Sequence, residues 1–149
     1  MVIPEYVKKF LQTHQIISLD TSIFIYFVEH NQQYYPICNL IFEKLEKGDI
    51  QVCTSSITLL EILVQPYRLK NDDLVLKFYS LLTTYPNIKW IDLTLSIADL
   101  AAKLRAEYRL KTPDSIQVAS AISHGATGFI CNDKAFKMIK EIECMVIDE

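Results

Sequence analysis

The chain has 149 residues and a formal net charge of −3, with 50% hydrophobic and 22% charged residues. This composition excludes a disordered chain, and three glycines with five prolines exclude a collagen-like repeat. The length is typical of one compact domain, so we expect residues 1–149 to form a single domain. The acidic balance excludes a uniformly basic nucleic-acid-binding surface, and any such partner must use a local patch.

No apolar run approaches the roughly 18 residues that a membrane-spanning helix needs. Glu5, Lys8 and Lys9 interrupt the apolar residues at the N-terminus, so we expect a cytoplasmic protein without membrane contact. The four cysteines are scattered without a Cys-x-x-Cys pair, which is typical of reduced thiols rather than of a zinc site or a disulfide scaffold.

Short apolar runs alternate with helical patterns along the chain. A short helix is expected within residues 1–15. The runs that follow it are apolar on both faces, as strands of a parallel sheet covered by helices are. They are Ile16–Leu19, Ile50–Cys53, Ile88–Ile91, Phe129–Cys131 and Met145–Ile147. The alternation predicts an α/β fold.

Helical segments are predicted between these strands. Residues 22–30 fit a helix or a strand, because the run is rich in β-branched and aromatic side chains. Apolar spacing predicts helices over Tyr34–Lys47, Leu74–Tyr85 and Ile97–Tyr108. Thr112 is predicted as the N-cap of a helix with Pro113 at its first position, running to about His124 with Gly125 as its stop.

Three aspartates lie where predicted elements begin or end. Asp20 follows the first strand, Asp133 follows the fourth, and Asp114 opens the helix near Thr112. Open parallel α/β sheets bind ligands beyond the carboxyl ends of their strands, which is where Asp20 and Asp133 are expected. Each aspartate alone also fits a local role, as a helix cap or as an acid that complements a helix dipole.

Glu61 fits no such local role. It lies in the mostly apolar run Ile57–Val64, which predicts a buried helix that is apolar on nearly all sides. Apart from histidine, it is the only charged residue between Asp49 and Arg68. A buried unpaired carboxylate is costly, so we expect Glu61 and the three aspartates to share a cation.

Four converging carboxylates suit a divalent cation that prefers hard oxygen ligands, namely Mg²⁺ or Mn²⁺. Such an ion can activate water, orient a phosphate and stabilise a leaving oxygen. The acids therefore favour metal-dependent hydrolysis of phosphodiester bonds.

Four motifs carry a family resemblance: Leu19-Asp20-Thr21-Ser22, Ser55-Ser56-Ile57-Thr58-Leu59-Leu60-Glu61, Thr112-Pro113-Asp114-Ser115-Ile116-Gln117-Val118-Ala119-Ser120-Ala121, and Cys131-Asn132-Asp133-Lys134-Ala135-Phe136. In this order they resemble the PIN-domain ribonuclease family, most closely the small VapC-type toxins of toxin–antitoxin pairs. The resemblance covers Ile16 to Asp148. It implies a three-layer αβα fold around a central, mainly parallel sheet of four to five strands. Residues 16–148 would form its core and residues 1–15 an N-terminal extension.

The resemblance also implies site residues. The acids that would hold Mg²⁺ or Mn²⁺ and carry catalysis are Asp20, Glu61, Asp114 and Asp133. The polar residues expected to support them are Thr21, Ser22 and Asn132. The implied activity is metal-dependent cleavage of RNA by metal-activated water, and the implied partners are RNA, a cognate antitoxin and a second copy of the chain. The position two before the last acid is often Ser or Thr in the family and here is Cys131.

Basic residues near two of the acids are candidates for contacts to RNA phosphates. They are Arg105, Arg109, Lys111, Lys134 and Lys137. An ordinary solvated helix face explains them equally well. The motifs contain no histidine or cysteine nucleophile, so direct attack by water is expected to leave 5′-phosphate and 3′-hydroxyl ends.

Two other functions stay open. A PIN-like fold could act as a non-toxin or as a catalytically inactive protein-binding module. A phospho-accepting receiver domain is also an α/β protein with acids around Mg²⁺. It needs a paired acid near the first strand, and Ile17-Ser18-Leu19 precedes Asp20 here without one.

Overall fold

The computed structural model describes residues 2–148; Met1 and Glu149, the ends of the expected domain, lie outside the described residues. Its centre is a five-stranded sheet in the order β3-β2-β1-β4-β5, in which every neighbouring pair is parallel. The strands are β1 (Ile16–Leu19), β2 (Gln51–Ser55), β3 (Ile88–Ile91), β4 (Gly128–Cys131) and β5 (Glu143–Val146). The predicted parallel α/β sheet is confirmed, with small shifts at the strand ends.

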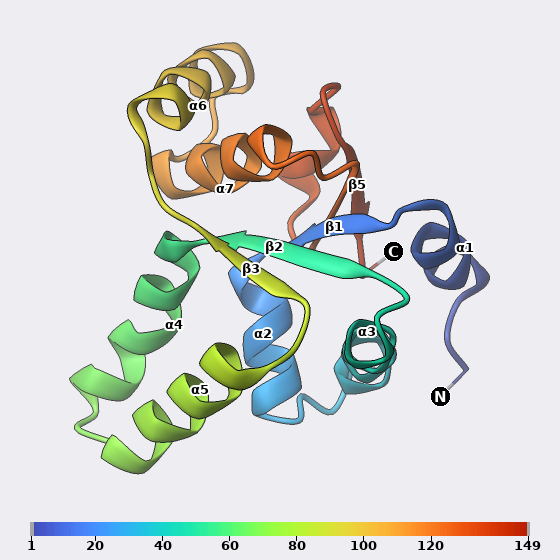
Figure 1. The fold of residues 1–149 in the computed structure, drawn as a ribbon, viewed down its shortest axis with the longest axis vertical. Coiled ribbons are helices and arrows are strands. Elements are labelled where there is room, and N and C mark those ends of the chain that lie inside the picture. The colour runs from blue at the N-terminus through green and yellow to red at the C-terminus, as the bar shows by residue number, and fades with distance from the viewer. Residues whose placement is uncertain (1, 149) are drawn as a thin grey trace.

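Helices cover both faces of the sheet, which gives the three expected layers (Figure 1). One face carries α6 (Leu95–Tyr108) and α7 (Thr112–Ser123). The other carries α2 (Thr21–Val28), α3 (Tyr35–Lys47), α4 (Ser56–Arg68) and α5 (Asp72–Thr84). A 3₁₀ helix, η1 (Lys134–Met138), follows β4, and α1 (Glu5–Thr13) lies beside the sheet near α3 (Figure 1). None of the helices in residues 2–148 has the length and apolar character that a bilayer crossing requires.

The strands are apolar on both sides because the sheet separates two cores. Ile17, Leu19 and Ile130 belong to the core under α2 to α5. Phe129 and Cys131 belong to the core under α6 and α7. Successive residues of a strand point to opposite faces, so β4 supplies both cores in turn.

The ambiguous segment 22–30 is mostly helical, because α2 buries Ile23, Phe24 and Val28 on one face against the sheet. The helix starts as soon as β1 ends, with the Ile23 amide bonded to the Asp20 carbonyl at 3.1 Å. The buried positions Ile23, Phe24 and Val28 have helical spacing and do not alternate as in a strand with one buried face.

The prediction that Thr112 caps its helix is wrong by one residue. Lys111 occupies the N-cap position of α7 and Thr112 is the first helical residue, with no side-chain cap. The Thr112 hydroxyl instead accepts a hydrogen bond from Arg105 Nε at 3.1 Å. Pro113 still fits, because an amide in the first turn has no partner within the helix. Gly125 follows the end of α7 with a positive φ of 89°, as the predicted stop requires.

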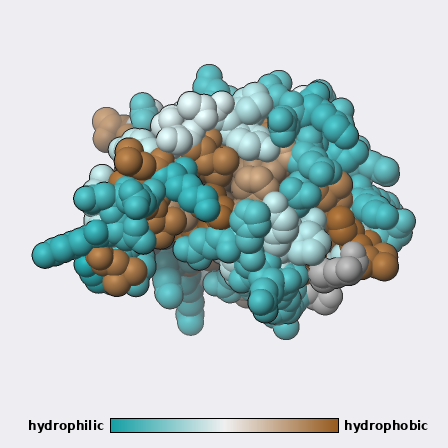
Figure 2. Space-filling view, turned by 90° about the horizontal axis from the view of Figure 1, so that it is seen from below, coloured by the Kyte–Doolittle hydropathy of each residue, from teal (hydrophilic) through white to brown (hydrophobic). Residues whose placement is uncertain are grey.

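The prediction that the helix around Glu61 is buried on nearly all sides is also wrong. Helix α4 buries Ile62 and Leu63, while Leu60 is 60% exposed and Val64 is 41% exposed. The reason is its place in the outer layer, where it packs mainly on α5 and α2. The view from below in Figure 2 shows apolar side chains at the surface among hydrophilic ones.

Helix α1 is tied to the start of β4. Its Phe10 is buried, and the His14 ring next to it lies with Nδ1 2.7 Å from Thr127 Oγ1. Tyr6 donates a hydrogen bond to the carbonyl oxygen of Ile147 at 3.1 Å. A Cβ atom added to Gly128 would lie 2.6 Å from Phe10 Cζ, so only glycine allows α1 to pack this closely.

Gly128→Ala should therefore lower the free energy of unfolding by about 1–3 kcal/mol, the usual cost of overpacking a core. Urea denaturation of the single variants and of a Phe10→Ala/Gly128→Ala double variant measures this. In the Phe10→Ala background the glycine substitution should cost clearly less. An equal cost in both backgrounds would contradict the packing of α1 on β4.

Candidate active site

The strand order identifies one edge of the sheet as the place for a site. The chain moves outward from β1 to β2 and β3, then crosses to β4 on the other side of β1. The carboxyl ends of β1 and β4 thus form a topological switch point, where open parallel sheets bind ligands. Asp20 follows β1 directly, and Asp133 follows β4 after one residue.

Asp20 holds the N-cap position of α2 but makes no capping hydrogen bond to that helix. Ser22 Oγ donates a hydrogen bond to Asp20 Oδ2 at 3.3 Å. The pKa of Asp20 is raised from 3.8 to about 6, chiefly by burial and then by the charges of Asp114 and Glu61; the Thr21 amide and the Ser22 hydroxyl act in the opposite direction. Asp20 is thus an acid whose ionisation the fold opposes.

Glu61 projects from α4 toward the start of α2. Thr21 Oγ1 donates a hydrogen bond to Glu61 Oε1 at 2.8 Å, and Gln117 Nε2 lies 3.5 Å from the same oxygen. The side chain is half-buried, although Leu60 beside it in the sequence is exposed. Glu61 therefore lies on the inner face of α4 rather than on its exposed apolar face.

Asp114 lies in the first turn of α7, at the same edge as Asp20. Its pKa is raised chiefly by burial, then by the charges of Glu61 and Asp133, while the charge of Lys111 acts in the opposite direction. The acid that complements a helix dipole is usually stabilised in its charged form. Here the neighbouring acids and burial outweigh that effect, so the local role alone does not account for Asp114.

Asp133 is a helix cap, which is one of the local roles predicted for it. It is the N-cap of η1, and its Oδ1 accepts a hydrogen bond from the Ala135 amide at 2.9 Å. Its side chain is exposed, yet its charge still acts on Asp114. Capping and membership of the acidic cluster are therefore compatible for this residue.

None of the four acids, Asp20, Glu61, Asp114 and Asp133, forms an ion pair with a cation of residues 2–148; Lys111 acts on Asp114 only through its charge. The ion pairs found among residues 2–148 join His14 to Glu143, Lys44 to Asp49, and Lys103 to Asp99. As the side chains lie, no three His, Cys, Asp or Glu residues of this range form a ready-made metal cluster. Mg²⁺ needs only one or two carboxylates directly, with water as its other ligands. The chemistry of this donor set, carboxylates with hydroxyls beside them, therefore fits a hard divalent cation.

The three predicted supporting residues lie differently with respect to the acids. Thr21 contacts Glu61 and Ser22 contacts Asp20, as described above. Asn132 contacts none of the acids through a hydrogen bond found in residues 2–148; its Nδ2 donates to the Tyr26 hydroxyl at 3.0 Å.

Cys131 stands where the family often has a hydroxyl residue, and its thiol is buried. Sγ donates toward the carbonyl oxygens of Asp133 and Met145, at 3.6 and 3.7 Å. Burial raises the pKa of this thiol to about 12, so it is a neutral group at physiological pH. Its hydrogen bonds support the turn that carries Asp133 rather than supplying a metal ligand.

The predicted basic residues are all exposed. Lys111 is close enough to Asp114 for its charge to lower that pKa. Arg105 is fixed through Thr112, and Arg109 ends α6 with a left-handed backbone (φ 56°). Lys134 and Lys137 lie on η1, whose N-cap is Asp133. Lys111 therefore lies beside Asp114, and Lys134 lies beside Asp133.

Sequence reasoning missed the polar residues buried behind the acids. Gln117 is 1% exposed, and its Nε2 donates to Thr58 Oγ1 and lies 3.4 Å from Thr21 Oγ1. The available signal was its position three residues after Asp114, beside the apolar residues Ile116 and Val118. A neutral amide among apolar residues attracts less notice than a charge, which is why Glu61 was found and Gln117 was not.

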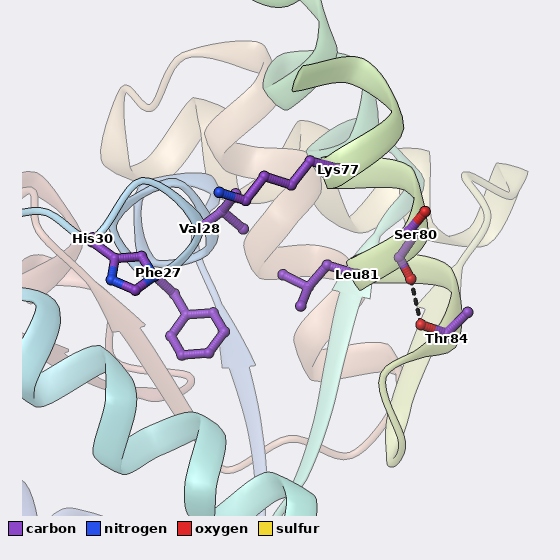
Figure 3. A pocket seen from close by; sticks show the side chains of 7 residues that line it. All are labelled: Phe27, Val28, His30, Lys77, Ser80, Leu81 and Thr84. Carbon is purple, nitrogen blue, oxygen red and sulfur yellow. Dashed lines mark hydrogen bonds between the residues drawn. The ribbon is translucent and has the colours of Figure 1, made fainter. Parts of the chain in front are cut away.

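A cavity of about 400 Å³ between α2 and α5 contains none of these acids (Figure 3). Its walls are mainly apolar, with Phe27, Val28 and Leu81 among them, and Lys77 extends across it toward α2. The Thr84 hydroxyl already donates to the carbonyl oxygen of Ser80. The acidic cluster, and not this cavity, is therefore the candidate active site.

Replacing Asp20 by Asn should stabilise the protein at pH 8, by up to about 3 kcal/mol for a raised pKa of this size. Between pH 3.8 and about 6 the folded state binds a proton that the unfolded state does not, so wild-type stability rises as the pH falls through this window. The gain in unfolding free energy caused by Asp20→Asn should therefore be smaller at pH 5 than at pH 8. Urea denaturation at pH 8 and pH 5 measures it, with Asp49→Asn as the exposed control. If Asp20→Asn did not raise the free energy of unfolding, or raised it equally at both pH values, the raised pKa of the buried Asp20 carboxylate would be contradicted.

Solved structures provide the comparison with known proteins. VapBC2 from Rickettsia felis, bound to a DNA fragment from its promoter, matches with a TM-score of 0.68 and 20% identity over 89% of this chain and 98% of that one. A toxin–antitoxin complex from Klebsiella pneumoniae matches with 0.68 and 23% identity over the same shares. VapC20 from Mycobacterium tuberculosis, a sarcin–ricin loop cleaving toxin, matches with 0.59 and 17% identity over 85% and 98%. At these identities the likeness shows the fold.

The comparison with curated proteins gave no match. The family model of the PIN domain matches residues 17–142, which begins after α1 and includes all four acids. This match covers most of the chain and agrees with the parallel sheet and its three layers. The chain therefore belongs to the PIN domain family.

Proposed function

We propose that this chain is a metal-dependent endoribonuclease and the toxin of a toxin–antitoxin pair. The observation that carries the proposal is the group of four carboxylates at the switch point of the sheet, which no cation of residues 2–148 balances in an ion pair. The pKa values of Asp20 and Asp114 are raised, chiefly by burial and then by the charges of neighbouring acids. Membership of the PIN domain family supports a nuclease.

The residues that would hold Mg²⁺ or Mn²⁺ are Asp20, Glu61, Asp114 and Asp133. The chemistry supplied there by the ion is activation of water and neutralisation of charge on the phosphate. Ser22 donates a hydrogen bond to Asp20 Oδ2, and Thr21 donates one to Glu61 Oε1. Each of these two carboxylates therefore has one oxygen fixed in position. Fixing these oxygens before substrate arrives reduces the reorganisation that catalysis needs.

The exposed basic residues beside the acids would bind the RNA backbone. Lys111 next to Asp114 and Lys134 next to Asp133 would approach phosphates on either side of the site. Arg105, Arg109 and Lys137 would extend this contact along α6 and η1. Such contacts position the substrate without reading its sequence. Within this proposal the chain acts in the cytoplasm as one domain, with residues 1–15 as an extension of the core.

A small antitoxin is proposed as a protein partner, because one similar solved structure is described as a toxin–antitoxin complex and another as a member of a family of toxin–antitoxin systems. The exposed apolar face of α4 and α5 is available for such a partner. Leu60, Tyr67 and Leu76 on it are 60%, 57% and 64% exposed.

A second copy of the chain is the other expected partner, and sedimentation equilibrium of the free protein tests that expectation.

Asp114→Asn should reduce RNA cleavage by at least about a hundredfold, because removing one preorganised charged group from a catalytic site costs this much or more. The assay uses a mixed RNA panel with Mn²⁺ or Mg²⁺, and EDTA should stop it. The products should carry 5′-phosphate and 3′-hydroxyl ends, as direct attack by water requires.

Asp49→Asn is the matched control, because Asp49 is an exposed acid that precedes β2, at the opposite edge of the sheet. It should cleave like the wild type. Full activity of Asp114→Asn, or 2′,3′-cyclic phosphate ends, would contradict the proposed mechanism. Folded wild type that binds no Mn²⁺ and cleaves no RNA would favour the alternative of a catalytically inactive protein-binding module.

A further inference from the structure

A chain of buried polar groups runs behind the acidic cluster. The Thr54 hydroxyl donates to the carbonyl oxygen of Leu19 at 3.5 Å, and Thr54 and Thr58 are joined through their hydroxyls at 2.7 Å. Thr58 in turn bonds Gln117 Nε2. These residues belong to β1, β2, α4 and α7, and the three side chains are at most 1% exposed.

The direction of these hydrogen bonds fixes the orientation of the amide. When Thr54 donates its proton to the Leu19 carbonyl, it accepts one from Thr58, which is one of the two directions open to this pair of hydroxyls. Thr58 has then used its own proton and must accept one from Gln117. Only the nitrogen of the amide can donate, so Nε2 and not Oε1 faces Thr58.

The same nitrogen has a second proton, and it lies toward the candidate site. Gln117 Nε2 is 3.5 Å from Glu61 Oε1 and 3.4 Å from Thr21 Oγ1, the hydroxyl that donates to that same carboxylate oxygen. Glu61 Oε1 is thus approached by two donors, one from the start of α2 and one from α7. The amide connects the helices that carry Asp114 and Glu61 with the segment that follows Asp20.

This arrangement is unfavourable for folding by itself. Gln117 Oε1 is buried and has no hydrogen-bond partner among residues 2–148. Burying an amide with one orphaned polar atom costs free energy that an apolar side chain of similar shape would not cost. A role in stability therefore does not account for the amide, whereas a role in holding the site does.

We propose that Gln117 is a positioning residue that fixes the Glu61 carboxylate for metal binding, through its own Nε2 and through Thr58 and Thr54 behind it. This inference rests on the proposed function, because it assigns the network to the same metal site. Partners that orient a metal ligand typically contribute about ten- to a hundredfold to metal affinity when they are removed.

The test is Mn²⁺ affinity in the absence of RNA, measured by calorimetry on the full chain, together with Tm in EDTA. Gln117→Met keeps the shape of the side chain and removes the donor. It should bind Mn²⁺ roughly ten- to a hundredfold more weakly, with a Tm in EDTA equal to or above that of the wild type. Ser120→Ala is the matched control. Ser120 is a buried residue on α7, outside the network, whose hydroxyl has no hydrogen-bond partner among residues 2–148. Removing this hydroxyl should leave Mn²⁺ affinity unchanged.

A second pair of variants separates positioning from general packing. Thr54→Val breaks the chain at its far end and should weaken Mn²⁺ binding in the same direction as Gln117→Met. In a Glu61→Gln background, Gln117→Met should cause no further loss, because the carboxylate through which it acts is already gone. A further loss of similar size in that background would overturn the inference.

The outcomes distinguish the inference from the function on which it rests. Wild type that binds Mn²⁺ with Gln117→Met binding equally well overturns the positioning role and leaves the metal site standing. Wild type that binds no Mn²⁺ overturns the proposed metal site and the inference with it. Weaker binding by Gln117→Met with a lowered Tm in EDTA would assign the amide to stability and would also overturn the inference.

Discussion

Negative charge gathered at one edge of the sheet, without an ion pair to a cation of residues 2–148, is the constraint on which the rest of the structure depends. Burial and mutual repulsion raise the pKa of Asp20 to about 6 and raise that of Asp114 above its usual value. A protein selected for stability alone would place a lysine or an apolar residue there. The fold instead keeps the acids together and fixes individual oxygens with Thr21 and Ser22. This arrangement is what a cation-binding centre requires.

The sheet topology explains how four distant parts of the sequence reach one place. The chain moves outward from β1 to β3 and then crosses to β4 on the other side of β1. Because β1 and β4 are parallel neighbours, Asp20 and Asp133 follow strand ends at the same edge of the sheet. Helices α4 and α7 then bring Glu61 and Asp114 to that edge from opposite faces of the sheet (Figure 1). The two cores hold these helices in place, so the packing on both faces of the sheet determines the geometry of the candidate site.

The sequence predicted the strands because each is a short run that is apolar on both faces, and it predicted Glu61 because a lone charge stands out in an apolar helix. It did not predict that Leu60 is exposed, because the packing partners of α4 depend on tertiary structure. Thr112 was misplaced as a cap because its hydroxyl is engaged by Arg105, seven positions earlier. Gln117 was missed because its significance lies in contacts with Thr58 and Glu61, which are far away in the sequence.

The most direct test of the central claim is to locate Mn²⁺ by anomalous diffraction from crystals of the wild-type protein grown with MnCl₂. We predict an anomalous peak among the carboxylates of Asp20, Glu61, Asp114 and Asp133, and its loss in crystals of Asp114→Asn grown in the same way. A peak elsewhere on the protein, or no peak at this edge of the sheet under conditions that saturate binding, would contradict the account.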